Sequence, residues 1–240
     1  MSSRIVSVII ANHNYKKYIA NAINSVLGQN YPAIVIVVDD HSTDGSIEYI
    51  NEKFDNHIES GRLFVLQNTS STCGPAIARN IGIEFASSFT DIFGFLDADD
   101  IYLQDKVGKS VKYLEDEAIG AVYSDYENFH EDTNILIREY KEPYSRTRLL
   151  QECIINNNSL VKKEALEKSG LYDPDLRTCE DYDLWLRVSE HYLLKHIPEC
   201  LIRHTTHPQN STSSVSNENW AKNRAYVFQK LAGRQNGVIQ

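Results

Sequence analysis

The residues with the clearest chemical potential are acidic and follow an apolar run. Residues 92–96 are apolar on both faces, and Asp97, Asp99 and Asp100 come directly after them. An uninterrupted apolar run is typical of a strand buried in a covered, parallel sheet. Ligands of such sheets bind beyond the carboxyl ends of the strands, where carboxylates can hold a divalent cation and a ribose. The alternative is an acidic turn in which Asp99 or Asp100 only caps the following helix.

A second acidic pair, Asp39 and Asp40, ends another apolar run at residues 34–38. Carboxylates brought together raise each other's free energy, so a fold that keeps them close needs a cation or hydrogen-bond donors. Mg²⁺ and Mn²⁺ bind oxygen ligands and can bridge carboxylates to a diphosphate. The acidic strand ends therefore favour a metal-bound nucleotide diphosphate, with two separate acidic helix caps as the alternative.

Strands and helices alternate through the first hundred residues and position these acids. Apolar, β-branched runs predict strands at residues 5–10, 34–38, 63–66 and 92–96. Apolar residues at helical spacing predict helices at residues 19–27 and 47–54, and a third opens at Pro75. This order predicts an α/β fold with a mainly parallel central sheet flanked by helices.

The second half is less regular and predicts a smaller, mixed part of the fold. Its predicted strands are residues 120–124, 135–138, 193–197 and 201–203, and its predicted helices are 163–168 and 183–192. Residues 208–219 are rich in Asn and Ser and predict a loop. A closing helix follows, and we expect it to pack on its own domain through one apolar face, made of Trp220, Val227, Phe228 and Leu231.

Composition excludes several classes of protein. Of 240 residues, 42% are hydrophobic and 24% are charged, as in a globular domain with a sizeable core. The net charge of -9 argues against nucleic-acid binding, which depends on Lys and Arg contacts with phosphates. No apolar stretch reaches the roughly 20 residues that span a bilayer, and the amino terminus leads directly into a strand, so we expect a cytoplasmic location. The four cysteines form no C-x-x-C pair, and we expect reduced thiols.

Seven short motifs follow one another over residues 4–214. They are VSVIIANHNY (6–15), VVDDHSTDG (37–45), GPAIARNIG (74–82), FLDADD (95–100), GLYD (170–173), CEDYDLWLR (179–187) and RHTTH (203–207). In this order they resemble a family-2 glycosyltransferase of the GT-A fold. The resemblance implies one Rossmann-like domain over residues 1–216, followed by a C-terminal helix and tail at 217–240. Residues 1–100 would form a nucleotide-sugar half and residues 101–216 an acceptor half.

The resemblance also implies roles for residues of the nucleotide-sugar half. Three residues of the first loop would lie at the base and ribose of the nucleotide: Ala11, Asn12 and Tyr15. Asp40 would accept a hydrogen bond from uracil, with Asp39 as the competing choice. Arg79 would hold the nucleotide or its phosphates, and Asp97 would contact the ribose.

A metal ion, Mn²⁺ or Mg²⁺, is the cofactor that the resemblance implies. Asp99 would be its ligand, with Asp100 nearby as the alternative. His207 matches a late histidine that can reach the metal or the diphosphate, and His204 is the second choice for that role.

The acidic pair Glu180 and Asp181 resembles the family's acid pair in the acceptor half. Asp181 would be the catalytic base, which takes the proton of the acceptor hydroxyl as its oxygen attacks the anomeric carbon. Glu180 would orient the acceptor. From the residues alone, the pair can equally be an acidic first turn of the helix at 183–192, which the helix dipole favours.

The expected activity is metal-dependent, inverting transfer of a sugar from a nucleotide-diphosphate sugar, with UDP expected, to an acceptor hydroxyl in polysaccharide or glycan synthesis. The acceptor would be a glycan, a lipid-linked glycan or a protein. One alternative is a nucleotidyltransferase, but its glycine-rich phosphate loop is missing from residues 11–17. The other is a non-catalytic nucleotide- or sugar-binding module. The closing helix carries four basic residues and one acidic residue, which suggests peripheral contact with the inner face of a membrane.

Overall fold

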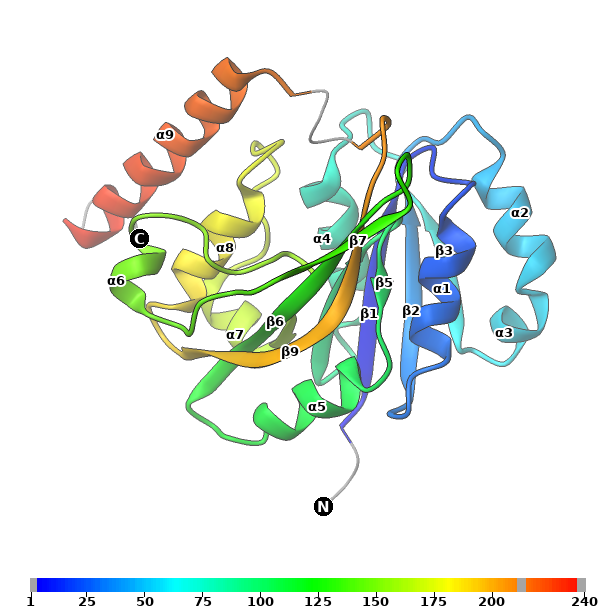
Figure 1. The fold of residues 1–240 in the computed structure, drawn as a ribbon, viewed down its shortest axis with the longest axis horizontal. Coiled ribbons are helices and arrows are strands. Elements are labelled where there is room, and N and C mark those ends of the chain that lie inside the picture. The colour runs from blue at the N-terminus through cyan, green and yellow to red at the C-terminus, as the bar shows by residue number, and fades with distance from the viewer. Residues whose placement is uncertain (1–3, 211–214, 237–240) are drawn as a thin grey trace.

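The computed structural model describes residues 4–210 and 215–236. In this part of the chain, nine strands form one sheet in the order β3-β2-β1-β4-β8-β6-β9-β5, and β7 pairs with β6 (Figure 1). The strands are β1 (Val6–Asn12), β2 (Ala33–Asp39), β3 (Leu63–Gln67), β4 (Ile92–Asp97), β5 (Ile101–Tyr102), β6 (Ile119–His130), β7 (Ile135–Glu139), β8 (Leu160–Lys162) and β9 (Leu193–Thr206).

Helices cover the sheet. They are α1 (Ile19–Leu27), α2 (Ser46–Lys53), α3 (Asp55–Glu59), α4 (Pro75–Ala86), α5 (Lys106–Tyr113), α6 (Arg146–Leu149), α7 (Lys163–Ser169), α8 (Glu180–Val188) and α9 (Asn217–Gln235). Side chains of β1 alternate between two apolar cores: Ile9 packs in the core that includes α4 and α8, and Val8 and Ile10 pack in the core that includes α1 and α5. The centre of the sheet is therefore buried on both faces, as its apolar strands predict.

The first half has the predicted parallel arrangement. β1 pairs in parallel with β2 and with β4, and β2 pairs in parallel with β3. In this register Asn12 lies beside Asp39, and Ala11 lies beside Asp97. The acidic ends of β2 and β4 thus flank the end of β1 at one edge of the sheet.

The second half is mixed, as predicted, but it contains fewer interruptions than the sequence suggested. β8 is antiparallel to β4 and to β6, while β9 is parallel to β6. The two short strands predicted at 193–197 and 201–203 are one strand, β9. Opposite β6, Ile197 is paired with Ser124 and Cys200 with Asp125, so residues 198 and 199 form a bulge. A bulge accommodates Pro198, which lacks the N–H that a regular ladder needs.

Two helix predictions need correction. α8 begins at Glu180, three residues before the predicted start, so the acidic pair forms its first turn, and it ends at Val188, four residues before the predicted end. α9 packs on the domain through Val227 and Leu231, as predicted, but Trp220 is 36% exposed. The first turn of α9 lies at the rim of a cavity that Trp220 lines, and not over the core. The predicted loop ends at residue 216, and its residues 211–214 lie outside the described residues.

No helix within residues 4–210 and 215–236 is long and apolar enough to cross a membrane. All four cysteines are free thiols.

Candidate functional site

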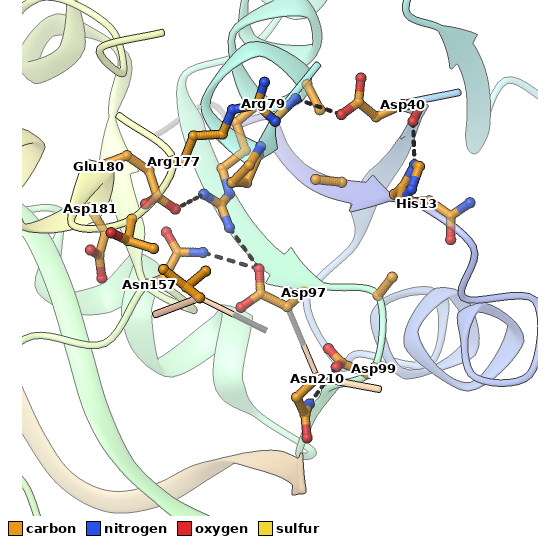
Figure 2. Close-up of a pocket in the computed structure, with 18 of the residues that line it drawn as sticks. His13, Asp40, Arg79, Asp97, Asp99, Asn157, Arg177, Glu180, Asp181 and Asn210 are labelled. Carbon is orange, nitrogen blue, oxygen red and sulfur yellow. Dashed lines mark hydrogen bonds and ion pairs between the residues drawn. The ribbon is translucent and has the colours of Figure 1, made fainter. Parts of the chain in front are cut away.

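A cavity of about 420 Å³ opens at the carboxyl ends of β1, β2 and β4 (Figure 2). Its walls come from both halves of the chain. The predicted site residues that line it are Ala11, Asn12, Tyr15, Asp40, Arg79, Asp97, Asp99, Glu180, Asp181 and His204. The predicted residues Asp39, Asp100 and His207 lie behind these and do not line the cavity.

The neighbours Asp39 and Asp40 have different surroundings. Asp39 is buried, and its two oxygens accept hydrogen bonds from Asn12 Nδ2 (2.7 Å) and from the backbone N–H of Ser42 (3.0 Å). Asp40 accepts from Asn68 Nδ2 and from the backbone N–H of Gly74, both at 2.7 Å, and its carboxylate also faces the cavity. Asp39 therefore shapes the first loop, and Asp40 is the acid that can contact a ligand.

Arg79 connects the two halves of the site. Its Nη2 atom lies 2.8 Å from Asp97 Oδ1, and its Nη1 atom lies 2.7 Å from Glu180 Oε1. The side chain is 5% exposed and lies over the ring of Tyr172, 5.3 Å from its centroid. Burial alone lowers the pKa of Arg79, but the two carboxylates outweigh this effect and raise it. The guanidinium is therefore a permanent positive charge that holds an acid from each half.

Asp97 is held by asparagines of residues 156–158, which were not among the predicted site residues. Asn157 Nδ2 donates to Asp97 Oδ1 (3.2 Å), and the backbone N–H of Asp97 donates to Asn158 Oδ1 (3.1 Å). Tyr172 in turn donates its hydroxyl hydrogen to Asn157 (3.1 Å). Three consecutive asparagines, residues 156–158, are the signal in the sequence that could have identified this wall of the cavity.

Asp99 contacts the predicted histidine. Its Oδ2 atom lies 3.1 Å from His207 Nε2 and accepts a hydrogen bond from Asn210 Nδ2 (2.8 Å). His207 Nδ1 accepts from the backbone N–H of Gln209 (3.2 Å), so Nε2 carries the proton of the neutral ring. The ring stacks on Tyr18 with centroids 4.4 Å apart. Burial, and then the charge of Asp97, raise the pKa of Asp99.

Asp100 points away from the cavity. It is 1% exposed, and its oxygens accept hydrogen bonds from the backbone N–H of Thr205 (3.0 Å) and from Asn158. Burial, followed by repulsion from Asp99, raises the pKa of Asp100 well above its usual value. The carboxylate thus ties the end of β4 to β9, and this argues against the alternative that Asp100 is a metal ligand.

Within residues 4–210 and 215–236, no three His, Cys, Asp or Glu side chains are grouped so as to hold a metal ion by themselves. Asp99 lines the cavity, and the imidazole of His207 contacts its carboxylate from behind. His204, the second choice, lines the cavity but hydrogen-bonds Asn128 at 3.4 Å.

The acidic pair of the acceptor half stands at the start of α8. Glu180 is bound by Arg79, while Asp181 lines the cavity and accepts the backbone N–H of Tyr182 on Oδ1 (2.7 Å). Its other oxygen accepts no hydrogen bond from the described residues. Burial, and then the charge of Glu180, raise the pKa of Asp181 to about 7. A carboxylate that titrates near neutral pH on a cavity wall is suited to general base catalysis.

Several lining residues were not among the predicted site residues. They include His13, Cys73, Arg177, Asn210 and Trp220. Arg177 stands three residues before Glu180, and this short distance from a predicted site residue is the signal in the sequence that could have identified it. Trp220 lies in the first turn of α9.

The sequence is similar to those of known glycosyltransferases. The sequence profile described as Glycosyl transferase family 2 matches residues 7–170. Chondroitin synthase of Pasteurella multocida (strain Pm70) is 27% identical over 234 residues, which are 96% of this chain and 23% of that protein. The putative teichuronic acid biosynthesis glycosyltransferase TuaG of Bacillus subtilis (strain 168) is 28% identical over 236 residues, which are 95% of this chain and 88% of that protein. The chain thus spans about a quarter of the chondroitin synthase.

Solved structures share the fold. The mannosyltransferase PcManGT from Pyrobaculum calidifontis, in complex with GDP-Man and Mn²⁺, superposes with a TM-score of 0.73 at 21% identity, over 97% of this chain and 65% of that chain. Residues 1–349 of S. aureus TarS in complex with UDP-GlcNAc give a TM-score of 0.70 at 20% identity, over 88% and 61% of the two chains. The predicted GT-A fold is thereby confirmed. Because the family profile covers more than half of the chain, this protein belongs to glycosyl transferase family 2.

Proposed function

We propose that this protein transfers a sugar from a nucleotide-diphosphate sugar, with UDP as the nucleotide, to an acceptor hydroxyl, and that it inverts the anomeric centre. One observation carries the proposal: acids of the nucleotide half, Asp40 and Asp97, face Asp181 of the acceptor half across a single cavity of about 420 Å³. A cavity of this size can enclose most of a nucleotide-sugar.

The nucleotide would be recognised by polar groups at the end of β1. Asp40 would accept the imide N–H of the uracil ring, since its carboxylate faces the cavity. The Oδ1 atom of Asn12 is buried and has no hydrogen-bond partner among the described residues. A buried acceptor without a donor is costly, so a hydroxyl or N–H group of a ligand would stabilise it. Asp97, held in place by Arg79, would accept the ribose hydroxyls.

A divalent cation fits the donor set beside the diphosphate. Asp99 would offer an oxygen ligand, and His207 would offer Nε2 as a nitrogen ligand once that atom has lost the proton it directs at Asp99. This mixed donor set suits Mn²⁺ better than Ca²⁺. Two protein ligands are enough for an ion that completes its shell with diphosphate oxygens and water. When bound, such an ion would neutralise the charge of the leaving diphosphate.

Asp181 would be the base. Its free oxygen can accept the proton of the acceptor hydroxyl as that oxygen attacks the anomeric carbon from the face opposite the diphosphate. Arg79 holds Glu180 and Asp97 in fixed positions on either side of this reaction path. A non-catalytic binding module would have no need of a carboxylate with a pKa of about 7 at this place, and nothing favours nucleotidyl transfer.

The acceptor is proposed to be a growing glycan or polysaccharide end, because the names of the chondroitin synthase and TuaG relatives refer to such polymers. Membrane contact through α9 remains a hypothesis. Three of its four basic side chains contact the domain: Arg224 binds the carbonyl of Gln151, Lys230 pairs with Asp173, and Arg234 pairs with Glu190.

The test is to incubate the protein with Mn²⁺ and a panel of UDP-sugars and to follow UDP release and the first-formed sugar product by NMR. The proposal expects release of UDP from at least one donor, with the product in the opposite anomeric configuration. Asp181→Asn should bind UDP normally and lose turnover. A product that retains the configuration would contradict the inverting mechanism, and UDP release that is unaffected in Asp181→Asn would exclude this base.

A further inference from the structure

Arg177 reaches across the mouth of the cavity. It belongs to the loop between α7 and α8, in the acceptor half, but its exposed side chain lies on the nucleotide half. Its Cδ and Nε atoms are 3.8 and 4.0 Å from the position that a Cβ atom on Gly74 would take. Its Nη1 atom lies 3.5 Å from Cys73 Sγ. Arg177 therefore spans the two halves, as Arg79 does at the floor of the site.

Gly74, on which Arg177 packs, also binds Asp40. Gly74 donates its backbone N–H to Asp40 Oδ2 (2.7 Å) and has a φ of 145°, a conformation that favours glycine. Figure 2 shows Arg177 and Asp40 in the upper part of the view, above Asp97. The side chain of Arg177 thus packs on the glycine whose N–H binds Asp40, the acid that we assign to the nucleobase.

The charge of Arg177 is available to a ligand. The other arginine of the cavity, Arg79, is neutralised by Asp97 and Glu180. Among the described residues, the guanidinium of Arg177 has only the thiol of Cys73 as a partner, which is a weak acceptor. A planar guanidinium without a carboxylate partner can stack on a flat aromatic ring.

The loop that carries Arg177 is fixed at two points by α9. Lys230 binds Asp173 Oδ2 (2.6 Å), and Asn223 Nδ2 donates to Thr178 Oγ1 (2.8 Å). These contacts hold the loop on either side of Arg177. α9 therefore helps to fix the position of this side chain over Gly74.

We propose that Arg177 closes over the nucleobase held at Asp40 and stacks its guanidinium plane on the base. It would thereby be a residue of the donor site that adds affinity for the nucleobase and is supplied by the acceptor half. This inference rests on the proposed function, because it requires a nucleotide in the cavity.

The experiment separates base contact from phosphate contact. Dissociation constants of uridine and of UDP with Mn²⁺ are measured by NMR titration for the wild type, for Arg177→Ala and for Arg138→Ala. Arg138 is an exposed arginine of β7 that does not line the cavity, so it controls for the loss of one positive charge. Cation–π stacking predicts that Arg177→Ala weakens both ligands by the same factor, about fivefold, and that Arg138→Ala changes neither.

Two results would overturn the inference while leaving the proposed function intact. If Arg177→Ala weakens UDP and leaves uridine unchanged, the residue binds phosphate and not the base. If it weakens neither, Arg177 is a surface arginine. Failure of the wild type to bind UDP or uridine would instead reject the proposed function, and the base contact with it.

Discussion

At the scale of single residues, Asp181 sets the pH dependence of the proposed reaction. Burial and the carboxylate of Glu180 raise the pKa of Asp181 to about 7. A base works only in its deprotonated form, so the transfer rate should rise as the pH rises through about 7 and level off above it. The measurement is turnover with the best UDP-sugar, followed from acidic to alkaline pH.

The matched variant is Glu180→Gln, which removes the nearest negative charge. The pKa of Asp181 should fall, and the midpoint of the pH profile should move to lower pH. Asp181→Asn should lower turnover by roughly 10²–10⁴ without a midpoint near 7. An unchanged midpoint in Glu180→Gln would mean that another group titrates.

Asp99 and Asp100 are neighbours with opposite roles. Asp100→Ala should leave the N–H groups of Thr205 and Asn158 without an acceptor in the interior, at a cost of about 2 kcal/mol in the free energy of unfolding. Asp99→Ala should cost less stability but remove the metal-dependent part of UDP binding. Urea unfolding and UDP titration distinguish the two variants. Loss of metal-dependent binding in a folded Asp100→Ala protein, with normal binding in Asp99→Ala, would reverse the assignment.

The acids of the site could be predicted from the sequence, but their division of labour could not. Asp39 and Asp40, and Asp99 and Asp100, are adjacent and chemically identical. What distinguishes Asp100 is the N–H group of Thr205, a residue 105 positions later in the chain. Only the folded arrangement of β4 and β9 brings these groups together.

At the scale of elements, α4 depends on one glycine for its contact with the sheet. A Cβ atom on Gly82 would lie 2.7 Å from Cγ2 of Ile9, which is fully buried in β1. Gly82→Ala should therefore destabilise the fold by about 1–3 kcal/mol through overpacking. This loss should outweigh the roughly 1 kcal/mol that alanine gains in a helix.

The control is Gly108 in α5. The nearest atom to a Cβ there is Cβ of Tyr31 at 3.5 Å, an ordinary contact. Gly108→Ala should stabilise the protein by up to about 1 kcal/mol. Equal effects of Gly82→Ala and Gly108→Ala in thermal or urea unfolding would refute the packing argument.

Apolar periodicity located most of the strands and most of the helices, because buried strands and amphipathic helices carry distinct patterns. It missed α5 and the short elements β5, α3 and α6. It failed at local exceptions. The polar interruption near Pro198 resembles a loop, yet the sheet continues through a bulge. The start of α8 at Glu180 agrees with the alternative of an acidic first turn. The apolar period alone placed the start three residues too late, because Cys179, at φ 62°, is not a usual helix cap.

At the scale of the whole molecule, α9 belongs to the domain that carries the site. Lys230 lies 2.6 Å from Asp173 and 2.9 Å from the fully buried Asp183 of α8. Lys230→Met should cost about 1–3 kcal/mol in the free energy of unfolding, because the buried carboxylate of Asp183 loses a positively charged partner while Arg187 still pairs with it.

Lys222→Met is the control, since this lysine of α9 is exposed and forms no ion pair with the described residues. It should change stability by less than about 0.5 kcal/mol. If both variants behave alike in urea unfolding, α9 is only loosely attached.

The cavity itself is the feature that the sequence predicted least. Its walls combine residues from Ala11 to Trp220, and no local pattern indicates that Arg79 joins Asp97 to Glu180, or that Arg177 lies on Gly74. Motif order indicated the family, and through it most of the acids. The asparagine wall and the second arginine needed the packed structure.

The proposed function requires that UDP and a metal ion bind together at Asp40, Asp97 and Asp99. Calorimetric titration of UDP in Mn²⁺ and again in EDTA, with GDP and CDP as competitors, tests it most directly. We expect UDP to bind in Mn²⁺ and to bind more tightly than GDP or CDP, and we expect EDTA and Asp99→Ala each to weaken its binding. Absence of UDP binding in both conditions, or equal binding in Mn²⁺ and EDTA, would contradict it.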